Sequence, residues 1–344
     1  MNPIKIWLPT QQNVAKPPSL LEIGFTKDSG LIHITKVTTL LLMIAGSSFS
    51  SPPAAISPSS DFLKYWKSGL AELSSYNLTT ERYGELRKGQ GVLVFVYEEI
   101  NADSRVKVET LKLPNEKQIP VLKLNSILKF TTGIYDYSIM TSVFAGLSGP
   151  GVTRILEPKK ISFSSQEWCG HVFHQVIPRK NGLSSEIHSY FEAEADSQKI
   201  IPYPVGPIYY EDEMPILVRE LDREFMPIGE TRQINFVPGL WQRRKRHVPL
   251  AFGLGTLTKI GKETILLRSE KIESIKWTLE TKGMVTTYHI EVAKPHKLLA
   301  WENSVGEKGE LIASIRNTYW EHNHNLDLPL RKTLGLNYGV GSGE

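Results

Sequence analysis

The sequence predicts a mainly β fold, either an antiparallel curved sheet or a partly open barrel or sandwich, with a few short helices. Short runs rich in β-branched and aromatic residues recur about every ten residues, separated by Gly, Pro, Asn and Asp. No helical segment of crossover length separates them, so a doubly wound nucleotide-binding fold is not expected. The glycines of 253–261 lack the strand-then-helix context of a phosphate-binding loop.

The individual elements follow from local patterns. The spacing of apolar residues in DFLKYWKSGLAELSSYNL (61–78) predicts a short amphipathic helix with Gly69 as its weak point. A second short helix is expected to begin near Pro215. Strands are predicted for GVLVFVYEEI, SRVKVETLKL, IPVLKLNSILKF, MVTTYHIEVA and GELIASIRNTYW, and ENSVGEKG resembles a hairpin.

Four segments are expected along the chain. Residues 1–60 are a disordered leader with a signal-like part, 61–205 an N-terminal antiparallel β region, 206–335 a C-terminal antiparallel β region, and 336–344 a flexible tail. The division is placed in the proline-rich stretch IIPYPVGPIYYEDEMP. This stretch joins either two sheets or two halves of one sheet.

An export signal is predicted within 31–60. Lys36 precedes an apolar run at 37–46, and small residues and prolines follow, as in a signal peptide with its cleavage region. The run is too short to span a bilayer, so no transmembrane span is expected in the mature chain. Because it begins about thirty residues after Met1, we expect a start site further downstream. The alternative is a buried apolar segment of a cytosolic protein.

Charge and cysteine content exclude several classes of function. The 40 basic and 36 acidic residues are interspersed, so the net charge of +4 creates no broad field and no nucleic-acid partner is expected. One cysteine excludes an internal disulfide framework and a four-cysteine zinc site. The basic run WQRRKRH (241–247) is interpreted as a peripheral solvated loop, with binding to a phosphate-bearing surface as the alternative.

The stretch SSQEWCGHVFHQV (164–176) holds the candidate site residues. Read as one continuous strand, it places Glu167, Cys169 and His171 on one face and Trp168 on the other. These four residues are predicted to contact a ligand. Cys169 itself is expected to be a small buried hydrophobe, so Cys169→Ser would cost about 1 to 3 kcal/mol.

Two chemical alternatives remain for this stretch. A nucleophilic cysteine would need a base from another strand. A zinc site would need Cys169 and His171 to meet His322 and His324 from the distant segment YWEHNHN. No catalytic residue, metal or cofactor is predicted.

Several stretches resemble those of an uncharacterised family of exported bacterial proteins, found in Bacteroidetes and related groups and often labelled "septum formation inhibitor Maf". They are SSQEWCGH, DYSIMTSVF, ELSSYNLTTERYGELRKGQGVLVFVYEE and SYFEAE, and the resemblance covers roughly residues 61–240. It implies export and β-structure and assigns no catalytic residue. True Maf proteins are nucleotide pyrophosphatases with an S-x-S-P-R-R stretch, which this chain lacks.

Three functions are therefore considered. The first is a periplasmic or otherwise exported, envelope-associated protein that binds a lipid or another apolar or amphipathic ligand on a concave sheet. The others are a hydrolase using Cys169 or a metal, and a nucleotide pyrophosphatase as the family label suggests. The first is preferred because the chain is rich in tryptophans suited to such a sheet: Trp168, Trp241, Trp277, Trp301 and Trp320.

Overall fold

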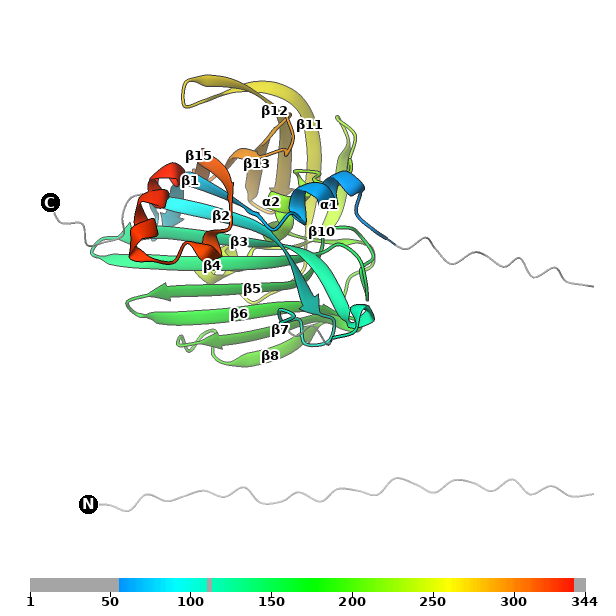
Figure 1. The fold of residues 1–344 in the computed structure, drawn as a ribbon. Coiled ribbons are helices and arrows are strands. Elements are labelled where there is room, and N and C mark those ends of the chain that lie inside the picture. Colours follow the sequence, from blue (N-terminus) through cyan, green and yellow to red (C-terminus); the bar gives the residue numbers. More distant parts are fainter. Residues whose placement is uncertain (1–55, 110–112, 337–344) are drawn as a thin grey trace, which may run out of the picture. The chain divides into compact units, whose positions relative to one another are not determined.

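The computed structural model describes residues 56–109 and 113–336. Within them, fifteen strands form one sheet in the order β8-β7-β6-β5-β4-β3-β2-β1-β15-β14-β13-β12-β11-β10-β9 (Figure 1). Neighbouring strands are antiparallel except β9 and β10, which are parallel. The predicted mainly β, antiparallel class is therefore confirmed, and the sheet stays open, with β8 and β9 as its two edges.

The sheet has two halves, which we call the N-terminal half and the C-terminal half. The N-terminal half contains β1 (Ala71–Arg82), β2 (Glu85–Asn101), β3 (Gln118–Thr132), β4 (Tyr135–Gly146), β5 (Glu157–Glu167), β6 (Gly170–Arg179), β7 (Gly182–Ser189) and β8 (Ser197–Ile201). The C-terminal half contains β9 (Ile208–Tyr210), β10 (Thr231–Val237), β11 (Gly253–Leu267), β12 (Glu270–Thr281), β13 (Met284–Glu291), β14 (Leu298–Asn303) and β15 (Lys308–Asn317).

The chain crosses once from one edge of the sheet to the other. It runs through β1 to β8 as a meander, passes through the proline-rich stretch to β9 at the far edge, and returns strand by strand to β15. There β15 pairs with β1, so that Leu73 lies opposite Ile315. The stretch at which the sequence divides thus joins two halves of one sheet.

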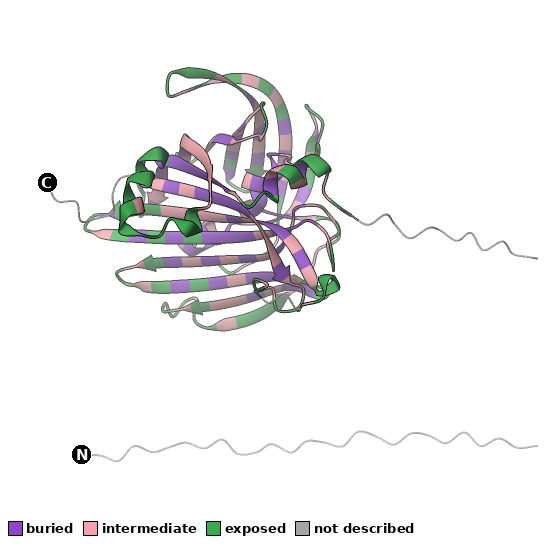
Figure 2. Ribbon diagram, in the orientation of Figure 1, coloured by how far each residue is buried: buried purple, intermediate pink, exposed green. Residues whose placement is uncertain are grey.

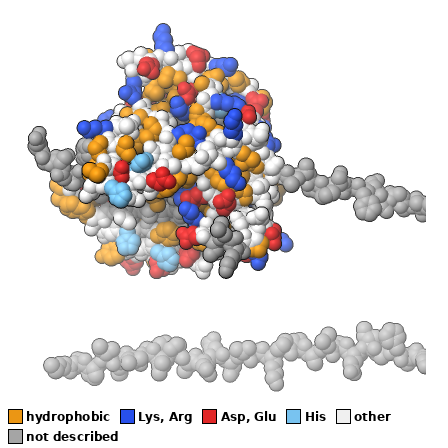
Figure 3. Space-filling model, in the orientation of Figure 1, with side chains coloured by type: hydrophobic (Ala, Val, Ile, Leu, Met, Phe, Trp, Pro, Cys, Tyr) orange, Lys and Arg blue, Asp and Glu red, His pale blue; other side chains and the backbone are white. Residues whose placement is uncertain are grey.

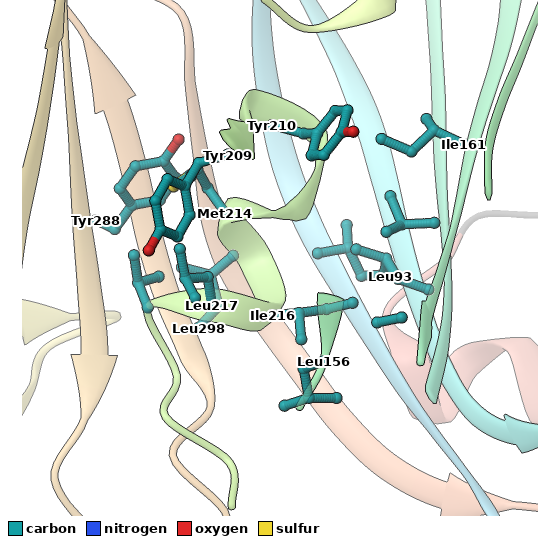
Figure 4. Packing of buried hydrophobic residues seen from close by; sticks show 14 of the residues in the cluster. Leu93, Leu156, Ile161, Tyr209, Tyr210, Met214, Ile216, Leu217, Tyr288 and Leu298 are labelled. Atoms are coloured by element: carbon teal, nitrogen blue, oxygen red, sulfur yellow. The ribbon is translucent and has the colours of Figure 1, made fainter. Parts of the chain in front are cut away.

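Both halves turn apolar side chains toward a shared interior. In strands such as β5 and β13 buried residues alternate with more exposed ones, as the period of two in a pleated strand requires (Figure 2). Helix α2 (Met214–Leu217) lies between the halves, with Tyr288 and Leu298 on one side and Leu93 and Ile161 on the other (Figure 4). The segment that links the two edges therefore also fills the interior.

The outer face of β1 and β2 is covered as well. Leu73 and Val94 pack there against Leu334 and Leu336, at the end of the 3-10 segment η4 (Asn325–Leu334). Strand β2 is therefore buried on both faces, which explains its continuous apolar run. The other short helical elements are α1 (Ser60–Trp66), η1 (Asn115–Lys117), η2 (Glu211–Glu213), α3 (Leu240–Arg246) and η3 (Tyr319–Glu321).

Two local predictions need correction. The N-terminal helix α1 is confirmed but ends at Trp66, because Gly69 adopts a φ of +79° and β1, from Ala71 onward, pairs with two strands. The predicted strand at 104–113 is wrong over its described part, 104–109, where Lys107 forms only an isolated bridge with Ile100. In the first segment the pairing of β1 decided against the helical pattern.

The export signal predicted within 31–60 lies mostly outside the described residues, which begin at residue 56. Among the described residues, no helix has the length and apolar character needed to cross a bilayer. Basic and acidic side chains are mixed over the surface seen in Figure 3, as the small net charge leads one to expect.

Candidate functional site

The stretch around the single cysteine is a hairpin and not one continuous strand. Strand β5 ends at Glu167, β6 begins at Gly170, and Trp168 and Cys169 form the turn between them. Both turn residues are exposed, so the expected burial of Cys169 is wrong. Gly170 is required here because a Cβ at this position would lie 2.7 Å from the ring of Tyr190.

The turn also changes which side chains share a face. In the hairpin Phe163 pairs with His174 and Ser165 with Val172, and all four are buried. His171 is exposed. The reversal at the turn makes odd-numbered residues face the interior before it and even-numbered residues after it.

The environment of Cys169 is unlike that of an activated nucleophile. The Glu167 carboxylate accepts a hydrogen bond from the Cys169 backbone amide at 2.6 Å. Hydrogen bonding to the same carboxylate raises the pKa of the exposed Cys169 thiol. Reactive cysteines need the opposite shift, so the geometry offers no support for a cysteine hydrolase.

The zinc alternative gains no support either. Among the described residues, no group of three or more His, Cys, Asp or Glu side chains is placed to hold a metal ion. Cys169 and His171 lie at the β5–β6 hairpin. His322 follows η3, and His324 precedes η4.

The interior between the two halves contains a cavity of about 160 Å³, which we call the central cavity. Both halves of the sheet and the segment between them contribute to its walls. The lining side chains are mostly apolar, with a few polar groups at two places. They are Leu78, Leu93, Leu124, Leu128 and Val143 from the N-terminal half, Thr286, Tyr288, Leu298 and Trp301 from the C-terminal half, and Glu211, Asp212, Pro215, Trp241, Gln242 and Glu307, among others.

Two adjacent carboxyl groups from η2 form the first polar group. Glu211 accepts a hydrogen bond from the Gly239 amide at 2.8 Å, and Asp212 accepts one from the Leu240 amide at 3.0 Å. These contacts tie η2 to the start of α3. The next residue, Glu213, is fully buried and pairs instead with Arg154 at 2.8 Å.

Burial gives these carboxyl groups unusual protonation properties. Desolvation raises the pKa of Asp212 to about 7 and also raises that of Glu211. Neither has an ion-pair partner among the described residues. The Tyr288 side chain lines the same cavity, and burial together with these two carboxyls raises its pKa well above the ordinary value. Asp212 is therefore partly protonated at neutral pH and can donate as well as accept a hydrogen bond.

The second polar group surrounds Glu307. Its carboxylate accepts hydrogen bonds from Thr80 at 2.9 Å, Gln242 at 2.9 Å and Asn303 at 2.8 Å, and it pairs with Lys245. These partners lower the pKa of Glu307 to about 2 despite its burial. Unlike Asp212, this carboxylate is a fully satisfied structural group.

Two of the predicted tryptophans line the central cavity. Trp301 packs against Tyr76 with ring centroids 4.8 Å apart and lies over Gly309, where a Cβ would be 2.2 Å from the indole. Trp241 stacks near Phe163 at 6.3 Å. Of the others, Trp277 is fully buried, and Trp168 and Trp320 are exposed.

The basic run is part of the structure, contrary to the prediction of a peripheral loop. Residues 240–246 form helix α3, in which Trp241, Arg243 and Arg244 are buried. Arg244 pairs with Glu194 at 2.7 Å, and Lys245 pairs with Glu307. The aromatic contacts of Trp241 hold the helix inside the molecule, so its cations need buried partners.

The carboxyl pair of the central cavity was not predicted. The sequence predicts a short helix near Pro215, and only the structure shows Glu211 and Asp212, which precede this helix, lining a cavity. Three acidic residues next to apolar segments were the available signal.

No family model, curated protein or solved structure matches this chain.

Proposed function

We propose that this protein binds a small, mainly apolar molecule that carries one neutral polar group, and that it does so in the central cavity. The observation that carries the proposal is the pair Glu211 and Asp212 on an otherwise apolar wall. A protonated Asp212 donates to an oxygen of the ligand, and Glu211 accepts from a hydroxyl or amide. A hydroxyl or carbonyl compound fits this pair, whereas an anion would be repelled.

The size of the cavity limits the ligand. Its volume of about 160 Å³ is close to the roughly 150 Å³ of a cavity that admits benzene. A molecule of one ring, or the end of a longer amphipathic molecule, therefore fits. The lining leucines supply the apolar contacts, and Trp301 supplies an aromatic face.

A cavity-filling variant tests the proposal. Ser126 lines the cavity and is only half-buried, so Ser126→Leu extends an apolar side chain into the space. Ser138, on the neighbouring strand, is exposed, and Ser138→Leu is the matched control. Native mass spectrometry of the purified proteins should detect the co-purifying small molecule in the wild type and the control and not in Ser126→Leu. Equal ligand content in all three proteins would refute the central cavity as the site.

A second candidate is proton transfer to the bound molecule, favoured by the pKa of Asp212 near 7. A carboxyl group at this pKa gives and takes protons readily at physiological pH. The step is removal of a proton from the carbon next to the carbonyl of a carbonyl ligand and its return to that carbon. In D2O the wild type, and not Asp212→Asn, should then place deuterium on this carbon, where it survives transfer of the ligand back into H2O. Ligand that binds and emerges with unchanged mass would favour binding alone.

We also propose that the mature protein is exported to the envelope, on the strength of the signal-like segment within 31–60. Fusion of this segment to a periplasm-dependent reporter should direct secretion with cleavage. Full-length protein in the cytosol would contradict it. The pyrophosphatase function suggested by the family label is tested by nucleotide turnover with purified protein, and we do not expect any.

A further inference from the structure

A second cavity, of about 230 Å³, lies on the other side of helix α3, and we call it the α3 cavity. Leu240, Arg243, Arg244 and His247 of α3 and its C-terminal cap line it, whereas Trp241 and Gln242 of the same helix line the central cavity. Its apolar lining comes mainly from the N-terminal half and the loop after α3. These side chains are Phe163, Val172, Ile187, Ile201, Val248 and Leu250.

Arg243 is the unusual residue of this cavity. Its side chain is buried, with only 6% of the residue exposed, and the only hydrogen bond it makes within the described residues is to the Val248 carbonyl. Its Nε has no partner there. No carboxylate in the described part of the chain pairs with it, and burial alone lowers its pKa to about 10. A buried guanidinium without a counter-charge is costly to the folded state.

The neighbouring charges do not balance Arg243. Glu194 also lines the cavity, but it already accepts from Arg244 at 2.7 Å and from His247 at 2.9 Å. Burial and Arg243 lower the pKa of His174 to about 4, so this imidazole is neutral and bonds to Ser185 at 2.8 Å. Lys199 adds a further positive charge to the lining.

We propose that the α3 cavity binds a monocarboxylate with an apolar body, whose carboxylate pairs with Arg243. The guanidinium supplies the charge-assisted hydrogen bonds that a carboxylate prefers. The surrounding Phe163, Leu240 and Leu250 cover the apolar body. The volume exceeds the roughly 150 Å³ that admits benzene, so a medium-chain fatty acid fits better than a bare inorganic anion.

The test uses octanoate, with thermal unfolding and calorimetry of the wild-type protein. Octanoate should bind and raise the melting temperature of the wild type and of Ser126→Leu, whereas phosphate at equal concentration should not. Octanol, which the central cavity can accept, should stabilise the wild type but not Ser126→Leu, in which that cavity is filled. Arg243→Met should weaken octanoate binding at least about tenfold, since it removes charge-assisted hydrogen bonds. Arg246→Met, an exposed cation of the same helix, is the matched control and should bind as the wild type does.

Stability separates a ligand anchor from a structural arginine. Because Arg243 has no carboxylate partner among the described residues, Arg243→Met without ligand should unfold at or above the wild-type temperature. Ser126→Leu changes the central cavity and should keep octanoate binding. Arg243→Met with unchanged affinity for octanoate would overturn the proposal. So would a melting temperature of the wild type that octanoate raises no more than phosphate does, a result that needs no folded variant to measure.

Discussion

The two cavities beside α3 differ in the sign of their unpaired charged groups: carboxyl groups in the central cavity and a guanidinium in the α3 cavity. In the central cavity Glu211 and Asp212 have no cationic partner among the described residues, and burial raises their pKa values. In the α3 cavity Arg243 has no carboxylate partner within the described part of the chain, and burial lowers its pKa. The same desolvation thus pushes an acid and a base toward their neutral forms on the two sides of one short helix.

This difference separates charges that hold the fold from charges that remain for a ligand. Arg244 and Lys245 of the same helix are matched by Glu194 and Glu307. Arg243 belongs to the same basic run, but no described carboxylate forms an ion pair with it. Burial together with the lack of a counter-charge therefore identifies candidate binding groups that charge alone does not.

Removal of the Glu307 charge, which is paired with Lys245 in the central cavity, should have the largest effect on the free energy of unfolding. Glu307→Gln leaves Lys245 buried without a counter-charge and should lower the free energy of unfolding by about 3–5 kcal/mol at pH 7, measured by urea titration. Because the pKa of Glu307 falls from 4.5 to about 2 on folding, its contribution is complete above pH 4.5 and disappears as pH falls toward 2.

The control for this variant is Glu310→Gln. Glu310 is exposed and pairs with Lys308 on the surface, so the substitution should change stability by less than about 0.5 kcal/mol. If the two variants lose equal stability, the distinction between matched buried charges and surface charges is wrong.

A change at Gly309 tests the wall of the central cavity alone. Gly309→Ala places a methyl group against the Trp301 indole and should cost about 1–3 kcal/mol while leaving octanoate binding intact. Gly253→Ala is the matched control, because a Cβ there meets no atom within 4 Å. Loss of octanoate binding in Gly309→Ala would show that the two cavities are not independent.

Asp212→Asn tests the unmatched carboxyl. The unfolded state loses this proton near pH 3.8, whereas the folded state keeps it to about pH 7, so Asp212 destabilises the protein progressively as pH rises between these values. The full shift corresponds to about 4 kcal/mol, and solvent screening of the partly exposed side chain reduces this to about 1–3 kcal/mol. The variant should therefore be more stable than the wild type by this amount at pH 8 and equal to it near pH 3.

The difference between the two unfolding profiles isolates this carboxyl, because other titrating groups are common to both proteins. The side-chain oxygen of the introduced asparagine can still accept the hydrogen bond from the Leu240 amide, so the contact that ties η2 to α3 is retained. Equal stability at every pH would show that Asp212 has an ordinary pKa.

The smallest effect is expected at Cys169, which lines neither cavity. Cys169→Ser should leave the free energy of unfolding unchanged within the error of a urea titration, because the side chain is exposed. The native thiol should be labelled completely by an alkylating agent without denaturant. A clear loss of stability together with slow labelling would restore the buried-strand interpretation that the sequence suggested.

Much of the fold could be predicted from local patterns. The strand predicted from MVTTYHIEVA is β13, and the helix predicted to begin near Pro215 is α2. The alternation of a pleated strand and the residue preferences of turns each involve only a few neighbouring residues, so strands can be predicted from the local sequence. The same local reasoning failed at Cys169, because a two-residue turn reversed the buried face of the strand that follows.

The sequence by itself determined the mainly β class, the antiparallel strands and the absence of a broad surface charge. Only the tertiary structure decided that β1 pairs with β15, that η2 and α3 enter the interior, and that Asp212 and Arg243 lack partners of opposite charge among the described residues. Those features depend on contacts between residues far apart in the chain. Burial and counter-charge are properties of the assembled interior, which no local pattern encodes.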